Sequence, residues 1–226
     1  MKNLSENFQE AIKDYVFLLE KNYPQKGILK LVGDRYKLSG IERTMLYRGI
    51  TSCEKSSGRI KKKSEESSIA GNQVNIDSLN QLLTITSYLN GSLVFISNDG
   101  FLRDASEIHG KMFRTGLMEK AVEMILQYAN TLDLYKLIFF IDKQVTKHEL
   151  VSNTINKIAL QYNLSFEIKI SDSVDHILKE TETGIIATSD SQIIDKSKVK
   201  IFDLARNTLK YFFNPNFIDL DSYQKK

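Results

Sequence analysis

Apolar residues in the first fifty positions recur every three or four residues, which is the spacing of one face of a helix. Three such runs are separated by Asn22-Tyr23-Pro24 and by a break near Gly33, and Ser39 with Glu42 has the spacing of a capping box before the third run. The positions that define the runs are Phe8, Ile12, Val16 and Leu19, then Ile28, Leu31 and Val32, then Ile41, Met45, Leu46 and Ile50. We therefore expect residues 1–54 to form a small all-α module, arranged like a helix-turn-helix.

From residue 72 onward, short β-rich apolar runs alternate with stretches of helical periodicity. The runs lie at residues 73–77, 92–97, 136–142, 164–171, 184–190 and a short 198–203, and the helical stretches at about 78–90, 115–131, 147–162 and 173–182. This alternation predicts an α/β domain over residues 72–226, with a mostly parallel sheet covered by helices on both faces. The runs SLVFIS and KLIFFID are almost purely apolar and suit buried strands, whereas LSFEIKIS alternates and suits a position nearer an edge.

The segment KSSGRIKKKSEESSIAG, residues 55–71, separates the two patterns. Because it is rich in Ser, Gly and charge, we expect a solvated linker, although its basic run from Arg59 to Lys63 would also suit phosphate contacts.

The bulk composition indicates a globular chain of 226 residues, with 42% hydrophobic and 26% charged residues. No apolar run approaches the roughly 20 residues that cross a membrane, and the polar amino terminus does not resemble a secretory signal. The single cysteine, Cys53, fits a reducing compartment, so we expect a cytoplasmic protein with no membrane association.

The net charge of +3 is unevenly distributed along the chain. Residues 1–71 hold 14 Lys and Arg against 9 Asp and Glu, a net +5, and residues 72–226 hold 17 against 19, a net −2. A basic front half suits a polyanionic partner such as RNA, but it equally suits charge that only maintains solubility.

Aspartates lie at or just after the ends of most predicted strands. Parallel strands place their carboxyl ends at one edge of the sheet, where open α/β sheets bind ligands. Crowded carboxylates raise one another's pKa, and a hard divalent cation relieves that conflict. We therefore predict a catalytic Mg²⁺ or Mn²⁺ site held by Asp77, Asp99, Asp142 and Asp190.

The same residues also fit a purely structural interpretation. Asp, Asn and Ser commonly cap the helix that follows a strand, and Asp77, Asp99 and Asp190 could each do only that. The pattern of residues leaves the cation site and the set of caps open.

Several familiar catalytic motifs are absent from the sequence. There is no P-loop, no dinucleotide-binding glycine motif and no GxSxG nucleophile elbow, and Asp77-Ser78-Leu79 lacks the second acid of a DxD phosphotransferase. With one cysteine and three scattered histidines, a site of Cys or His ligands is also disfavoured.

The segment VNIDSLNQLLTI, residues 74–85, resembles the DGxN first strand of NYN-type nucleases, which are part of the PIN-like group of metal-dependent ribonucleases. Asp77 matches the metal-binding Asp of that motif and Asn80 its orienting Asn, while Ser78 stands where the motif prefers Gly. The segment ATSDSQIID, residues 187–195, resembles the late PIN-like segment whose Asp binds metal, here Asp190, and Asp142 matches a middle acid. The resemblance implies a Rossmann-like, PIN-like fold and action on RNA.

The whole chain also resembles a prokaryotic domain-of-unknown-function family that joins a short helical module to this α/β domain. The resembling segments are LVGDRYKLSGIERTMLYRGI (31–50), NDGFLRDASEIHGK (98–111) and ATSDSQIID (187–195).

Other polar residues are candidates for substrate contact. Arg103 would hold a phosphate oxygen, and Asn80, Asp104 and Ser189 would orient ligands or water. His109 could shuttle a proton, because its ordinary pKa lies near neutrality. Alternatively, an Asp99–Arg103 or an Arg103–Asp104 network only shapes the loop, and His109 is structural or merely exposed.

In the helical module, Arg43 and Arg48 lie near Tyr47, a combination that suits contact with phosphates and bases. Packing within the module, or docking onto the α/β domain, explains the same residues.

The leading hypothesis is therefore a metal-dependent phosphodiesterase that acts on RNA. The alternatives are a noncatalytic RNA-binding or adaptor protein and an enzyme that hydrolyses small nucleotides with the same carboxylates.

Overall fold

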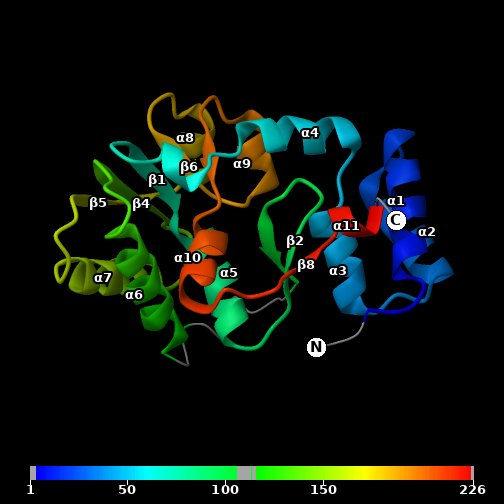
Figure 1. Cartoon of the computed structure of the whole chain (residues 1–226), viewed down its shortest axis with the longest axis horizontal. Helices are drawn as coiled ribbons and strands as arrows, with labels where there is room; N and C mark the ends of the chain where they lie inside the picture. The colour runs from blue at the N-terminus through cyan, green and yellow to red at the C-terminus, as the bar shows by residue number, and fades with distance from the viewer. Residues whose placement is uncertain (1–3, 106–112, 114–115, 225–226) are drawn as a thin grey trace. The chain divides into compact units, whose positions relative to one another are not determined.

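The computed structural model describes residues 4–105, 113 and 116–224, which fold into two compact units (Figure 1). The first, which we call the helical unit, consists of residues 1–61, 92–107 and 216–226, and the second, the sheet unit, of residues 62–91 and 108–215. The chain therefore passes from one unit to the other four times. Within the described residues, no helix combines the length and the apolar character needed to span a bilayer.

The helical unit combines helices with a small three-stranded sheet. Strand β2 is central in that sheet and pairs antiparallel with β3 and parallel with β8. The elements are α1 (Phe8–Glu20), α2 (Gln25–Arg35), α3 (Gly40–Gly49), α4 (Cys53–Lys62), β2 (Val94–Ile96), β3 (Leu102–Asp104), β8 (Ile218–Asp219) and α11 (Asp221–Gln224). The three helices expected at the amino terminus are thus present.

Helix α3 begins at the expected capping box. The Ser39 hydroxyl accepts a hydrogen bond from the Glu42 amide at 3.3 Å, and Glu42 Oε2 accepts one from the Ser39 amide at 2.8 Å. The apolar faces of α1, α2 and α3 meet in one core, which Phe95 of β2 and Leu220 complete. The small sheet is therefore part of the core that the helices build.

Helix α4 occupies the first half of the segment that we expected to be a solvated linker. Its inner face is polar: the Ser56 hydroxyl donates to the Asn98 carbonyl at 2.8 Å, and Arg59 pairs with Asp99 at 2.9 Å. Both Ser56 and Arg59 are buried. A helix that buries hydrogen-bonded polar groups does not show the apolar periodicity from which helices are predicted.

The run at residues 92–97 forms strand β2, but this strand does not join the parallel sheet, contrary to our expectation. Its burial on both faces was anticipated, because Val94, Phe95 and Ile96 are all buried. An apolar strand can be buried just as well in a second, smaller sheet, so its burial does not show which sheet it joins. The strands that pair with β2, β3 and β8, are too short for their sequences to predict them.

The sheet unit is built around five parallel strands in the order β5-β4-β1-β6-β7. Its elements are the 3₁₀ turn Glu66–Ser68, β1 (Gln73–Asp77), α5 (Ser78–Leu89), α6 (Leu117–Ala129), β4 (Lys136–Asp142), α7 (His148–Ala159), β5 (Phe166–Ser171), α8 (Val174–Glu180), β6 (Ile185–Ala187), α9 (Ser191–Lys196), β7 (Ile201–Phe202) and α10 (Leu204–Phe213). The predicted α/β architecture with a parallel sheet is confirmed in this unit.

The strand order reverses between β1 and β6. From β1 the chain proceeds outward to β4 and β5, and it then returns to the other side of β1 to add β6 and β7. Because parallel crossovers are right-handed, the two directions place their helices on opposite faces, with α8 and α9 across the sheet from α6 and α7 (Figure 1). Ligands of open α/β sheets bind at such a switch point, beyond the carboxyl ends of the two strands.

The two edges of the parallel sheet differ. Beside β7, Lys63 forms a parallel bridge with Ile201, and the Ser64 amide donates to the Ile201 carbonyl at 2.7 Å. Strand β5 forms the other edge, as the alternating pattern of LSFEIKIS predicted.

Candidate functional site

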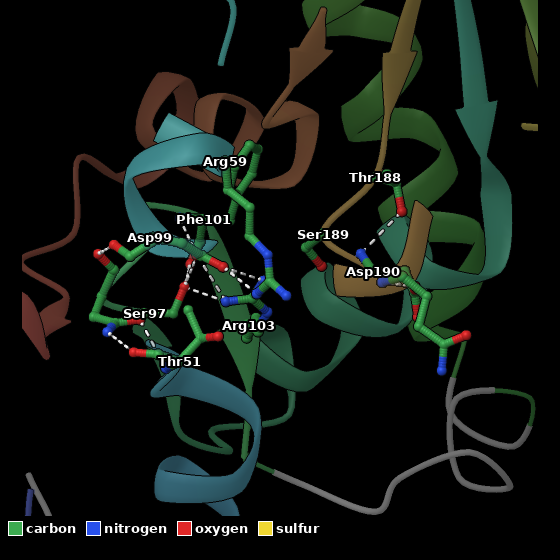
Figure 2. A network of polar contacts seen from close by, with 12 residues as sticks. Thr51, Arg59, Ser97, Asp99, Phe101, Arg103, Thr188, Ser189 and Asp190 are labelled. Atoms are coloured by element: carbon green, nitrogen blue, oxygen red, sulfur yellow. Dashed lines mark hydrogen bonds and ion pairs between the residues drawn. The ribbon is translucent and has the colours of Figure 1, made fainter. Parts of the chain in front are cut away.

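The ends of β1 and β6 bring polar residues together at the switch point of the sheet unit. Asp77 is the last residue of β1, and Thr188, Ser189 and Asp190 follow β6. The Thr188 hydroxyl donates to Asp77 Oδ2 at 2.8 Å. The same hydroxyl accepts a hydrogen bond from the Asp190 amide at 3.0 Å (Figure 2). Thr188 is therefore hydrogen-bonded to both Asp77 and Asp190, which are two of the four aspartates predicted to bind a cation.

The Asp77 carboxyl is held in an unfavourable setting for negative charge. Its pKa is raised to about 7, chiefly by burial and in addition by the negative charges of Asp190 and Asp175, while the hydrogen bond from Thr188 lowers it. The residue as a whole keeps some accessible surface. A nearby cation would favour the charged form of this group and so lower its pKa.

Asn80, in the first turn of α5, fixes the loop that follows β6. Its Oδ1 accepts hydrogen bonds from the Ser189 amide at 2.9 Å, the Ser189 hydroxyl at 3.0 Å and Gln81 Nε2 at 2.8 Å. The fully buried Gln81 in turn accepts from the Ala205 amide at 2.8 Å, which anchors it to the start of α10. The Asn80 side-chain oxygen is thus used inside the protein, and its effect on a ligand would be exerted through Ser189.

Asp190 also caps helix α9. Its Oδ1 accepts from the Gln192 amide at 2.7 Å and from the Ile193 amide at 3.1 Å. These bonds use one carboxylate oxygen, and Oδ2 takes part in neither. Capping and ligand binding at Asp190 are therefore compatible.

Asp142 ends β4, the other neighbour of β1, but it lies farther along the sheet. The strand register pairs Asp77 with Phe140, which places Asp142 two residues beyond Asp77. Its Oδ1 accepts from the Gln144 amide at 2.8 Å and so stabilises the local turn. In the part of the chain that the structure describes, no three His, Cys, Asp or Glu side chains lie close enough together to hold a metal ion as a group. Of the four predicted ligands, the structure brings Asp77 and Asp190 together.

Asp99 belongs to the helical unit and serves a different purpose there. It is fully buried. Arg103 donates to both of its carboxylate oxygens at 2.8 Å, and Arg59 donates to Oδ2 at 2.9 Å (Figure 2). Ser97 donates to the same carboxylate. The two guanidinium groups hold the pKa of Asp99 well below its ordinary range despite its burial. This is the structural network that we weighed as the alternative, and it accounts for Asp99 and Arg103 without a ligand.

The remaining predicted contact residues of the helical unit also have partners within it. Arg43 Nη2 binds Asp34 at 2.9 Å, and its Nε donates to the Leu38 carbonyl at 3.1 Å. Arg48 pairs with Asp104 at 3.1 Å, so two predicted substrate contacts meet each other. His109 lies outside the described residues.

The sequence did not point to Thr188, which belongs to the candidate site, or to Arg59, which binds Asp99 in the helical unit. In the sequence, Thr188 stood only as part of the segment ATSDSQIID, and Arg59 as one of several charges in the expected linker. For Thr188 a usable signal was present, since a hydroxyl two residues before a capping Asp can bridge to a neighbouring strand. For Arg59 we find none, because its partner Asp99 lies 40 residues away in the sequence.

The fold and these contacts define an α/β protein with a five-stranded parallel sheet and an acidic candidate site at its switch point. The chain belongs to the family described as Domain of unknown function (DUF5616), whose model matches residues 66–207, and the family described as Protein of unknown function (DUF434) matches residues 7–63. An uncharacterised protein of Methanocaldococcus jannaschii is 25% identical over 206 residues, which cover 91% of this chain and 98% of that protein. No solved structure matches the chain.

Proposed function

We propose that the sheet unit is a Rossmann-like, PIN-like domain that binds Mg²⁺ or Mn²⁺ at Asp77 and Asp190 and hydrolyses phosphodiester bonds, with RNA as the substrate. The observation that carries the proposal is the meeting of two carboxylate residues at the switch point, joined through Thr188. Support also comes from the strand order, which is that of the first five strands of dinucleotide-binding α/β sheets.

The groups at this site suit a hard divalent cation. The side chains offer carboxylate and hydroxyl oxygens, which are the donors that Mg²⁺ and Mn²⁺ favour. Mg²⁺ commonly takes only one or two carboxylates and completes its shell with water and substrate phosphate, so two acids are sufficient. The raised pKa of Asp77 supports the same conclusion, because a cation would offset the charge that burial and Asp190 disfavour.

Each residue of the site then has a defined task. Asp77 and Asp190 would hold the cation, and Thr188 orients Asp77 through its hydrogen bond. Asn80 fixes the Ser189 amide and hydroxyl beside the site. A bound divalent cation would supply Lewis acidity toward a phosphate oxygen and would lower the pKa of a coordinated water.

The test is cleavage of single-stranded RNA by the purified full-length protein with Mn²⁺, compared with Asp77→Asn and Asp190→Asn. Asn keeps the shape of each side chain and, at position 190, a good capping group. Asp195→Asn, an exposed change on the same helix as the cap, is the matched control. We expect wild type and the control to cleave and both site variants to lose at least about a hundredfold in rate, as is typical when a metal ligand's setting is disturbed. Equal cleavage by Asp77→Asn would refute the catalytic assignment.

The competing functions give different results in the same assays. A noncatalytic RNA-binding protein would bind RNA in a salt-dependent manner with no metal requirement. It would also show no rise in melting temperature with Mn²⁺, whereas a ligand of the folded state stabilises it by mass action. Cleavage of nucleoside triphosphates but not of RNA would identify a small-nucleotide hydrolase instead.

A further inference from the structure

The outer edge of strand β5 in the sheet unit is open. Among the described residues no strand pairs with its far side, whereas the opposite edge of the sheet, at β7, is met by Lys63 and Ser64. Natural proteins usually block an edge of this length, because its unpaired amides and carbonyls can recruit another strand. Strand β5 spans Phe166–Ser171.

The hydrogen bonds to β4 show which backbone groups of β5 point outward. The Ser165 and Ser171 carbonyls accept from Leu137 and Lys143 of the β4 side, each at 2.9 Å. Because the backbone direction alternates along a parallel strand, residues 165, 167, 169 and 171 face β4. The amides and carbonyls of Phe166, Ile168 and Ile170 therefore point away from the sheet.

The sequence around Ile168 is complementary to itself when it is read in the opposite direction. In an antiparallel pair centred on Ile168, each Glu167 lies opposite a Lys169 of the second strand. Phe166 lies opposite Ile170, and Ser165 lies opposite Ser171. In this register the backbone hydrogen bonds between the two strands are made by Phe166, Ile168 and Ile170, whose backbone groups point outward. The backbone geometry and the pairing of side chains therefore both place the centre of the pair at Ile168.

The two faces of the strand agree with this arrangement. Glu167 and Lys169 share one face, where Glu167 already contacts Lys136 at 2.8 Å and Lys169 at 3.6 Å. Phe166, Ile168 and Ile170 share the other face, and Ile170 is 44% exposed. A lysine on an edge strand ordinarily opposes pairing. In this register every lysine meets a glutamate, so the charges favour one partner, which is a second copy of the chain.

We propose that the protein forms a symmetric homodimer in which two β5 strands pair antiparallel about Ile168 and join the two parallel sheets into one ten-stranded sheet. The proposal does not depend on the catalytic proposal, since it uses no residue of the Asp77–Asp190 site.

Charge reversal tests the proposal with the full-length protein in sedimentation experiments across micromolar concentrations. E167K places lysine against lysine and K169E places glutamate against glutamate, so each should raise the dimer dissociation constant about tenfold or more. An equimolar mixture of the two variants should regain the dimer, because each pair again has opposite charges. A folding defect would not be repaired by mixing. K120E on the exposed face of α6 is the control and should leave the dimer intact.

Register is tested by crosslinking. Position 168 lies opposite itself, at a Cα separation of roughly 5.5 Å that permits a disulfide. With the native cysteine removed by Cys53→Ser, Ile168→Cys should form a covalent dimer on oxidation with diamide. Ile170→Cys in the same background should not, because residue 170 lies opposite Phe166. A monomeric wild-type protein, a mixture that stays monomeric, or equal crosslinking at both positions would overturn the proposal.

Discussion

At the scale of single residues, the buried setting of Asp77 should make the stability of the protein depend on pH. A carboxyl whose pKa is raised to about 7 on folding binds protons more tightly in the folded than in the unfolded state. The free energy of unfolding therefore falls as the pH rises from about 4 to about 7. We expect Asp77→Asn to remove this loss and to be more stable than wild type at pH 8, by on the order of 2 kcal/mol after allowance for solvent screening.

Urea denaturation of wild type and variant at acidic and mildly alkaline pH measures this effect. The difference between the two proteins should nearly vanish in acid, where the carboxyl is neutral in both states. Asp195→Asn should show no comparable change between the two conditions. A variant that matches wild type in acid but is less stable than wild type at mildly alkaline pH would mean that Asp77 is stabilising in its charged form.

For Asp99 we expect the opposite effect, because its negative charge stabilises the folded protein. Asp99→Asn would leave Arg59 and Arg103 buried without the carboxylate that binds both, and we expect a loss of roughly 3–5 kcal/mol of stability. The depressed pKa means that this contribution is present above the ordinary carboxyl range and is lost as the pH falls toward the folded value. Thermal unfolding of Asp99→Asn beside Asp104→Asn checks it, since the Arg48–Asp104 pair is more exposed and its loss should cost less. Near-wild-type stability of Asp99→Asn would contradict a structural role.

These residues show what the sequence alone could and could not reveal about the site. The placement of Asp77 and Asp190 at one sheet edge followed from strand ends and parallel topology. Asp99 has the same local signature, an acid just after an apolar run, yet its partners are Arg59 and Arg103. Only the tertiary structure distinguishes the two cases, because the deciding charge comes from a distant helix.

At the scale of elements, helix α9 offers a way to distinguish the capping role of Asp190 from a role in cation binding. Its six residues follow directly from Asp190, which binds the Gln192 and Ile193 amides. We expect Asp190→Ala to cost about 1 kcal/mol, because both capping bonds are lost, and Asp190→Asn to cost only a few tenths. Melting temperatures with and without Mn²⁺ then distinguish the roles. If Asp190 also binds the cation, both variants lose the Mn²⁺-dependent rise, whereas a cap alone predicts that neither does.

Long elements with a regular pattern were predictable, and short or polar ones were not. Strands β1 and β4 begin and end where the apolar runs indicated, and α5 and α7 follow the expected helical stretches closely. Strands β3 and β8 have three and two residues and draw their stability from β2, so no local pattern marks them. Helix α4 was missed because its buried face carries Ser56 and Arg59 instead of apolar side chains.

At the scale of the whole molecule, the helical unit depends on distant parts of the chain. Its core joins residues of α1 and α3 with Phe95 and Leu220. Gly49 shows how closely they pack, since a Cβ there would lie 2.4 Å from the Phe95 ring and 2.7 Å from Leu220. The sequence pattern divides the chain into consecutive segments. No local feature of the sequence indicates that residues 92–107 and 216–226 belong to the helical unit.

This dependence predicts that residues 1–63 do not fold by themselves, although one family model ends at that boundary. Without Phe95 and Leu220 the three helices would expose the apolar surface that those side chains cover, and we expect weak near-ultraviolet circular dichroism and no cooperative unfolding.

In the full-length chain, Leu220→Ala should cost about 2–5 kcal/mol of stability, because it opens a cavity in a fully packed core. Hydrogen exchange should then accelerate in α1 and α3 while the amides of β4 stay protected, since β4 belongs to the sheet unit. If α1 and β4 lost protection together, the two units would unfold as one, and the helical core would depend on more than the three segments that build it.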